Sequence, residues 1–334
     1  MGYPEGRMQQ TEQQAIPTQK HSGFAAQGIA YLDGRFVPME DAKVSIATHA
    51  FNYGTGCFEG IRGYWNADHE ELYLLKLNHH FRRLLNSTRL FRMDIGMSAD
   101  ELTSLAVELV RRNGYREDVY VRPIAYKASP VIRVGLLDLE DAFCCFTAPM
   151  GAYLPIDRGL SVTVSGWRRN DDNAIPARAK ATGGYLNAAL AISDAKDAGF
   201  DEAILLTGDG HVSEASSSNL FIVMHDELIT PEVSDDILVG ITRNAVMEVA
   251  ARLGIPAVQR RIDRTELFVA DEIFLCGTGV QVAPVTKVDG RVIGDGEIGD
   301  VTRAVQNLYL QAVHGEVEEF RDWLTPAYGR APWL

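Results

Sequence analysis

The strongest constraint on this 334-residue chain is an interruption near its middle, from Ala148 to Pro155. Prolines and a glycine fall within this segment, so neither a strand ladder nor a helix is expected to continue through it. The length of the chain suits more than one domain. We therefore expect a small α/β domain at 23–147, a linker at 148–156 and a larger domain at 157–334.

The first 22 residues differ from the rest in composition, being rich in Gln, Gly, Pro and Thr. They lack the apolar stretch that a signal peptide needs, and we expect residues 1–22 to form a disordered tail. No run elsewhere approaches the ~18 apolar residues of a membrane span, so no membrane association is expected. The formal net charge of −13 argues against non-specific binding to nucleic acid.

Cysteine and histidine spacing give no metal motif. The four cysteines lie in apolar runs without CxxC spacing, which favours free thiols in a reducing compartment over disulfides or a metal site. The eight histidines show no HxH or HExxH spacing, and the adjacent His79 and His80 would project about 100° apart on a helix. We therefore expect a cytoplasmic protein without a metal site.

Turn and capping signals predict the elements of the first half. Asp33-Gly34 is a favoured turn pair between two apolar runs, which predicts a hairpin. Ser98 and Glu101 form a capping box at the start of a helical pattern that Gly114 ends. The predicted elements are a hairpin at 29–38, helices at 78–90 and 98–114, and strands at 120–125 and 142–147.

The second half alternates apolar runs with polar turns. Gly208-Asp209-Gly210 and His225-Asp226-Glu227 each separate two apolar runs and predict antiparallel strands, and Gly199 is placed to end a helix. The predicted elements are strands at 160–165, 203–206, 211–212, 220–224, 228–230 and 272–276, and helices at 185–198, 242–253 and 301–313. The chain is therefore expected to be of the α+β class.

Among the seven lysines, Lys180 has the most unusual surroundings. It lies in Pro176-Ala-Arg-Ala-Lys180-Ala-Thr-Gly-Gly184, where small residues let the backbone approach another body closely. A lysine crowded by small apolar residues loses water, and such an amine is a nucleophile that can form a Schiff base. A surface lysine in a flexible loop is the alternative, and the spacing alone leaves both open. Four other lysines are expected in solvent: Lys20, Lys43, Lys196 and Lys287.

Three features could bind an anion such as phosphate. Thr242 opens a predicted helix, whose first N–H groups have no partner within the helix. Gly277-Thr278-Gly279 offers a similar turn after a buried strand. Arg83 lies among apolar neighbours and has the fork that binds phosphate through two donors. The alternatives are a helix cap at Thr242, a simple turn at the glycines and an internal ion pair at Arg83.

Further charged residues lie near the predicted strands. Glu214 falls in a polar segment between two apolar runs, where a carboxylate could support a pyridinium nitrogen; a capping or turn role is the alternative. Tyr120 and Arg122 are two apart on a strand and share one face. An inward arginine needs a carboxylate partner, which either the protein or a substrate must supply.

Together these segments resemble the class IV aminotransferases, and most closely the branched-chain amino-acid aminotransferases. Tyr53-Gly-Thr-Gly-Cys-Phe58-Glu59-Gly60-Ile61-Arg62 is similar to that family's YGTxxFEGIR signature. Later blocks match in order: Tyr120-Val-Arg122-Pro123, Ala179-Lys180-Ala-Thr-Gly-Gly-Tyr185, Ser213-Glu214 with Asn219-Leu220-Phe221, Leu238-Val-Gly240-Ile241-Thr242-Arg243, and Gly277-Thr278. The resemblance covers roughly Gly28 to Tyr309. It implies the two-domain α+β fold of type IV pyridoxal 5′-phosphate (PLP) enzymes, with a β-barrel-like core in the larger domain.

The resemblance also implies how PLP is held. Lys180 would be the catalytic residue that forms the Schiff base and carries the proton, and Glu214 would pair with the pyridine nitrogen. Tyr185 would contact the phenolic oxygen of the ring, and Leu238 would pack against the ring face. The phosphate would be held by Arg83, Ile241, Thr242 and Thr278.

For substrates, the resemblance implies ping-pong transamination of leucine, isoleucine or valine with glutamate and 2-oxoglutarate. Arg122 would take the distal carboxylate of glutamate, so that one pocket accepts both apolar and acidic side chains. The substrate-binding set would be Tyr53, Phe58, Arg62, Tyr120, Arg122 and Gly279. Members of this family form homodimers in which each subunit supplies part of its partner's pocket.

Several positions depart from the family's usual pattern. Ser216-Ser217-Ser218 replaces a glycine-containing turn, Met150 replaces a tryptophan, residues 127–135 replace a glycine-rich loop, and Val280-Gln281 replaces Ala-Glu. They leave the catalytic set intact and put the substrate range in question. The alternatives are an (R)-selective amine transaminase, a D-amino-acid transaminase, an aminodeoxychorismate lyase, or a non-catalytic binding protein on the same fold.

Overall fold

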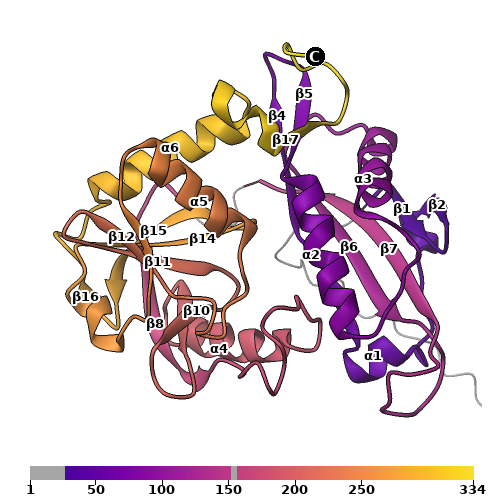
Figure 1. The fold of residues 1–334 in the computed structure, drawn as a ribbon, viewed down its shortest axis with the longest axis horizontal. Helices are drawn as coiled ribbons and strands as arrows, with labels where there is room; N and C mark the ends of the chain where they lie inside the picture. Colours follow the sequence, from indigo (N-terminus) through magenta and orange to yellow (C-terminus); the bar gives the residue numbers. More distant parts are fainter. Residues whose placement is uncertain (1–26, 152–155) are drawn as a thin grey trace, which may run out of the picture.

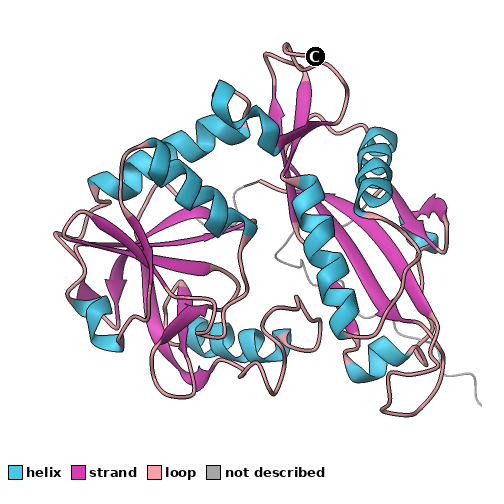
Figure 2. Cartoon of the chain, in the orientation of Figure 1, coloured by secondary structure: helices cyan, strands magenta, loops and turns pink. Residues whose placement is uncertain are grey.

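The computed structural model describes residues 27–151 and 156–334, so the tail predicted at 1–22 and part of the linker lie outside the described residues. The strands form two sheets with helices packed against them (Figures 1 and 2). This arrangement confirms the predicted α+β class. Among the residues described, no helix combines the length and apolar character needed to cross a membrane.

The first sheet has eight strands in the order β17-β5-β4-β6-β7-β1-β2, and β3 pairs with β6. Nearly all of it comes from the first half of the chain. Its members are β1 (Ile29–Leu32), β2 (Arg35–Pro38), β3 (Gly56–Phe58), β4 (Ile61–Asn66), β5 (Glu71–Leu75), β6 (Val119–Lys127), β7 (Asp141–Pro149) and β17 (Leu324–Pro326). Helices α2 (Leu77–Leu90) and α3 (Ala99–Asn113) share a core with these strands, and the short α1 (His49–Tyr53) precedes β3.

Local rules account for the predicted elements of this half. Asp33 and Gly34 both have positive φ, 51° and 78°, which the tight hairpin turn between β1 and β2 requires. The capping box of Ser98 and Glu101 is present, and Gly114 ends α3 in the left-handed conformation. Strands β3, β4 and β5 are not predicted by the same rules. A glycine interrupts the apolar pattern of β3 and of β4, and β5 is a short apolar run without a turn pair of this kind beside it.

The second sheet has nine strands in the order β10-β9-β8-β15-β14-β11-β12-β13, and β16 pairs with β15. It is mixed, since β8 runs parallel to both β9 and β15 whereas β9 and β10 are antiparallel. Its members are β8 (Leu160–Arg168), β9 (Glu202–Leu206), β10 (Val212–Ala215), β11 (Asn219–Met224), β12 (Glu227–Thr230), β13 (Ala257–Gln259), β14 (Glu272–Gly277), β15 (Gln281–Val288) and β16 (Arg291–Val292).

The helices of the second half pack against this sheet at different places. Helix α4 (Tyr185–Asp197) buries alanines against β9, whereas α5 (Ile241–Arg252) and α6 (Asp300–Val313) share a core with Phe221 and Phe274 (Figure 2). The 3₁₀ turns lie at Met39–Asp41, Arg264–Phe268 and Glu318–Trp323. The predicted helices of this half therefore form. Its strands β13, β15, β16 and β17 were not predicted, and β15 is the longest of these.

The last strand returns to the first sheet. In Figure 1 the yellow C-terminal segment lies beside β4 and β5, and β17 pairs with β5 in antiparallel fashion. Tyr64 of β4 approaches Tyr309 of α6, with 3.3 Å between their hydroxyl oxygens, inside a core that also contains Phe221. The two halves are therefore joined by a shared core as well as by the linker.

Candidate active site

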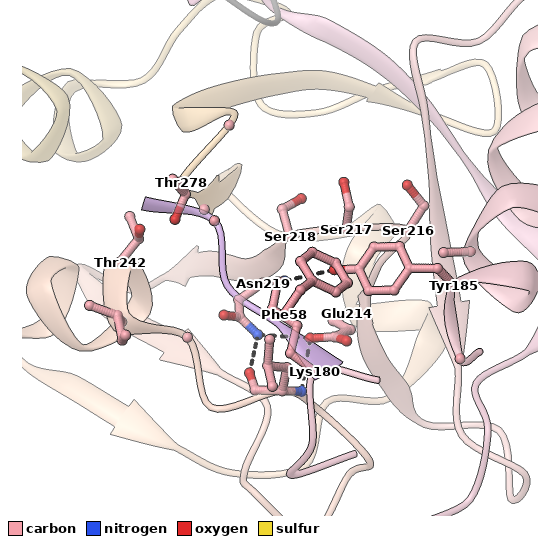
Figure 3. Close-up of a pocket in the computed structure, with 18 of the residues that line it drawn as sticks. Phe58, Lys180, Tyr185, Glu214, Ser216, Ser217, Ser218, Asn219, Thr242 and Thr278 are labelled. Atoms are coloured by element: carbon pink, nitrogen blue, oxygen red, sulfur yellow. Dashed lines mark hydrogen bonds between the residues drawn. The ribbon is translucent and has the colours of Figure 1, made fainter. Parts of the chain in front are cut away.

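A cavity of about 500 Å³ is lined by residues from both halves of the chain. From the first half come residues such as Phe58, Tyr120 and Arg122, and from the second half the segments around Lys180 and Glu214. Figure 3 shows side chains from these separate segments turned toward one space. A site of this size with a few charged groups suits a small-molecule ligand.

The loop that carries Lys180 is held against β3. Phe58 donates its backbone N–H to the carbonyl of Lys180 at 3.0 Å, and Cys57 and Ala181 form a β-bridge. A Cβ added to Gly54 would lie 2.8 Å from the Cα of Gly183, so only small residues allow this approach. Lys180 therefore lies in a fixed segment, and the alternative of a surface lysine in a flexible loop is wrong.

The amine of Lys180 points into the cavity beside two aromatic rings. Its Nζ donates to the hydroxyl of Tyr185 at 2.7 Å and lies 5.2 Å from the centre of the Phe58 ring (Figure 3). The Phe58 and Tyr185 rings are themselves 4.9 Å apart. A primary amine held at an aromatic wall can attack a carbonyl carbon and can carry a proton.

Glu214 lies in β10, and three donors reach its carboxylate. One oxygen accepts from the side-chain amide of Asn219 at 2.9 Å and from the backbone N–H of Leu238 at 3.1 Å. The other oxygen forms an ion pair with Arg169 at 2.7 Å. Burial raises the pKa of Glu214, and Arg169 and the Leu238 N–H oppose that shift. Glu214 is therefore a strand residue facing the cavity, and not a turn or cap.

The N-terminus of α5 forms another part of the wall. Gly240 is its N-cap and supplies no side chain to the first turn, so the N–H groups there have no side-chain cap. Thr242 is the second helical residue and 3% exposed, which excludes the cap alternative for its side chain. Thr278 and Gly279 lie in the turn after β14 and also line the cavity. Backbone donors and hydroxyls here suit an anion.

Arg83 reaches this wall from α2 and has an acidic partner. Its Nε and one terminal nitrogen donate to the two oxygens of Glu59, each at 2.7 Å, and its other terminal nitrogen donates to the carbonyl of Val239 at 2.8 Å. The predicted alternative of an internal ion pair is therefore present. Arg83 nevertheless lines the cavity, where its bond to Val239 holds it beside the residue that precedes the N-cap of α5.

Tyr120 and Arg122 share the cavity-facing side of β6, as their spacing predicts. Arg122 donates to the Tyr120 hydroxyl at 2.8 Å, and its guanidinium lies 4.4 Å from the centre of the Phe58 ring. Among the described residues no acidic side chain pairs with Arg122, and its buried Nε has no hydrogen-bond partner. A buried cation without an acid can be compensated by an anionic ligand.

Two predicted substrate residues do not line the cavity of this chain. Arg62 is 2% exposed and is paired with Asp118 at 3.2 Å; it also donates to the carbonyls of Met150 and Gly151. The structure therefore gives Arg62 a protein carboxylate in place of a substrate. Tyr53 lies in α1 at 37% exposure, away from the cavity wall.

Sequence reasoning missed two parts of the site. Arg169 lies in a polar loop after β8, and Glu59 with His80 lies behind Arg83. Arg169 carries no local signal, because its partner Glu214 is distant in sequence. Glu59 is part of the FEGIR signature, so its place in that motif could have marked it.

Comparisons with known proteins agree with this geometry. The family model described as amino-transferase class IV matches residues 56–288. A probable branched-chain-amino-acid aminotransferase of Aquifex aeolicus is 45% identical over 90% of this chain and 97% of its own length. A solved branched-chain aminotransferase of Thermoproteus uzoniensis with norvaline is 42% identical, with a TM-score of 0.87 and coverage of 90% and 100%. Another, from Thermobaculum terrenum in its PLP form, is 36% identical, with a TM-score of 0.87 and coverage of 90% and 99%.

Proposed function

This chain belongs to the branched-chain group of the class IV aminotransferases, and from that premise we propose that it transfers the amino group of leucine, isoleucine or valine to 2-oxoglutarate with PLP as cofactor. One observation supports this most directly. The cavity brings together Lys180, the apolar ring of Phe58 and the cation of Arg122. That combination accepts an apolar side chain in one half-reaction and an acidic one in the other.

The residues present fit PLP. The amine of Lys180 is available to its aldehyde, and the hydroxyl of Tyr185 lies beside that amine, near the expected phenolic oxygen. The carboxylate of Glu214 offers a partner for the ring nitrogen, and the side chain of Leu238 is in the cavity wall to cover the ring face. The phosphate would lie at the remaining wall, held by Arg83, Ile241, Thr242 and Thr278.

The protein then has to bind substrate, hold it and move a proton. PLP supplies an electron sink for the negative charge left when the Cα proton departs. With substrate bound, Lys180 would be a free amine, and it would take the Cα proton and deliver it to the cofactor carbon on the other side of the substrate nitrogen. The negative charge of Glu214 would favour a protonated ring nitrogen, and the ion pair with Arg169 favours the ionised form of that carboxylate.

We place the substrate α-carboxylate at the Tyr120 hydroxyl and the backbone of Thr278 and Gly279, which line one side of the cavity. The side chain would then lie against Phe58, with Arg122 beyond it. Arg122 is positioned by Tyr120 and has no acidic partner within 27–151 and 156–334, so the distal carboxylate of glutamate or 2-oxoglutarate is its proposed partner.

Arg122→Ala tests this assignment with two acceptors on one variant. We expect KM for 2-oxoglutarate to rise by about 10- to 100-fold, because a charge-assisted hydrogen bond to the distal carboxylate is lost. KM for 2-oxo-isocaproate, which has no such carboxylate, should change by less than about threefold. Equal losses for both acceptors would contradict the role of Arg122.

The overall reaction is tested by the absorbance spectrum of the purified protein. A yellow protein that loses its visible band on addition of L-leucine, and regains it with 2-oxoglutarate, would support the proposal. A band that ignores L-leucine and responds to a D-amino acid or an (R)-amine would move the chain to another class IV activity. A protein that stays colourless when PLP is added would contradict the proposed role of Lys180.

We also propose that the protein is a cytoplasmic homodimer with domains at 23–147 and 157–334. All four cysteines are free thiols, which suits a reducing compartment. Ile46, Phe51, Tyr53, Ile132 and Val134 are exposed apolar side chains on α1, at position 46 and in the segment 132–134, and we call this set the α1 surface. The loop that carries Ile132 is fixed to α1, because His49 Nε2 bonds the carbonyl of Arg133 at 2.7 Å. Such a surface suits a second copy, into whose cavity Tyr53 would reach.

Phe51→Asp combined with Ile132→Asp tests the dimer. Phe51 and Ile132 are 71% and 88% exposed, so the single chain tolerates an aspartate at each position. In the proposed dimer both aspartates would be buried without a positive partner. We expect the dissociation constant to rise at least about 100-fold, measured by light scattering across a dilution series. Val292→Asp is the control, since Val292 is also exposed at 52% and lies on β16. An unchanged mass in the double variant would contradict the proposed interface.

A further inference from the structure

Behind Arg83 lies a carboxylate that no solvent reaches. Glu59 follows β3 and is 0% exposed. Its two oxygens accept from three N–H groups: Nε and a terminal nitrogen of Arg83, and Nδ1 of His80, each at 2.7 Å. His80 lies on α2 one turn before Arg83 and is 2% exposed. One buried acid thus joins two side chains of the same helix.

The charges in this cluster are fixed. Burial of Glu59 opposes its ionisation, but Arg83 and His80 outweigh burial and lower the pKa of the carboxyl to about 2. Burial lowers the pKa of His80, although Glu59 opposes that shift. Since a carboxylate can only accept, the proton of neutral His80 lies on Nδ1. The cluster therefore consists of one anion, one cation and one neutral donor.

The cluster determines which N–H groups Arg83 has left. A guanidinium has five N–H donors. Glu59 takes two of them along one edge, and the carbonyl of Val239 takes a third. Val239 immediately precedes Gly240, the N-cap of α5. The two remaining donors are therefore presented where the free N–H groups of α5 begin.

We propose that Glu59 and His80 are positioning residues that hold the guanidinium of Arg83 in the orientation that binds the cofactor phosphate. This inference rests on the proposed phosphate site. Without Glu59 the arginine would keep its charge but could rotate its fork, and the two free donors would no longer be held at the start of α5. His80 fixes the carboxylate by donating to a third acceptor position of its two oxygens.

If the ion pair were purely structural, its loss would weaken binding of all ligands of the cavity alike. If it orients Arg83 toward the phosphate, its loss would weaken binding of phosphorylated ligands only. Pyridoxal carries the same aldehyde and ring as PLP and lacks the phosphate. Titration of the full-length apoprotein with PLP and with pyridoxal, followed by visible absorbance, therefore isolates the contribution of the phosphate. The ratio of the two dissociation constants is the measured quantity.

For Glu59→Gln we expect PLP to bind about 10- to 100-fold more weakly, while pyridoxal changes by less than about twofold. Glu71→Gln is the matched control, because Glu71 is also 0% exposed and accepts from the N–H groups of Leu72, Tyr328 and Arg330, away from the cavity. It should keep the wild-type ratio. Glu59→Asp retains the charge and should recover part of the loss.

Equal weakening of PLP and pyridoxal by Glu59→Gln would overturn the inference and leave a structural ion pair. If Glu59→Gln does not fold, His80→Leu provides the same test, with an expected loss of about 3- to 10-fold for PLP alone. An unchanged ratio in His80→Leu would then overturn it. If the wild-type protein bound neither compound, the proposed cofactor site would itself be wrong and this inference would fall with it.

Discussion

Replacement of Lys180 by alanine is expected to lower kcat by at least about 10⁴-fold. The reason is that, in the proposed function, one amine is both the covalent anchor of the cofactor and the carrier of the Cα proton. Tyr185 cannot replace it. Its hydroxyl accepts the Lys180 hydrogen bond, and a hydroxyl cannot form a Schiff base. Steady-state turnover of L-leucine and 2-oxoglutarate gives the rate.

A chemical measurement separates loss of the anchor from loss of folding. Borohydride reduction of the wild-type protein should add the cofactor mass to the peptide that contains Lys180, and the variant should show no such addition. Lys196→Ala is the control, since Lys196 is an exposed lysine in the last turn of the following helix. A Lys180→Ala protein that retained turnover within tenfold of wild type would contradict the assignment.

Glu214→Gln is expected to reduce kcat by about 10²- to 10³-fold while PLP still binds. Glutamine is nearly the same size and can keep contact with Asn219, but it cannot balance a positive ring nitrogen. Arg169 would lose its acidic partner at the same time. Its uncompensated charge would disfavour a second positive charge on the ring nitrogen. The proton on the ring nitrogen would be lost, and with it the electron sink.

Single-turnover measurement with L-leucine tests this, because it isolates the proton-transfer step from product release. Glu202→Gln is the matched control: Glu202 is 3% exposed on the neighbouring strand β9 and does not line the cavity. Burial raises the pKa of both carboxyls, so Glu202 controls for the removal of a buried, desolvated acid. Near-normal turnover in Glu214→Gln would remove Glu214 from the proposed role.

The sequence predicts well where neighbouring residues decide the structure. The hairpin at Asp33-Gly34 and the helix that begins at Ser98 follow from local turn and capping rules, and both are confirmed. The motif blocks also predict most of the cavity wall, because short segments carry their geometry with them. Lys180, Glu214 and Thr242 all line one cavity.

Prediction fails where a partner is distant in sequence. Whether an inward arginine pairs with protein or substrate depends on a contact that no local pattern encodes. Arg62 and Arg122 look alike in the sequence, yet Arg62 is paired with Asp118 and Arg122 has no acid among the described residues. Strand β15 was missed because Gln281 and Pro284 break its apolar pattern, and only pairing with β8 and β14 makes it a strand.

The return of β17 to the first sheet has a consequence for how the chain can fold during its synthesis. Strand β5 is made before every strand of the second sheet, yet its partner at Leu324–Pro326 is made only after all of them. Two further contacts join the same segments: the N–H of Ala327 donates to the carbonyl of Leu72, and the N–H of Tyr328 donates to Glu71. One edge of the first sheet must therefore stay unpaired while the strands of the second sheet are translated. That edge would need protection, for example by a chaperone, for as long as translation of those strands takes.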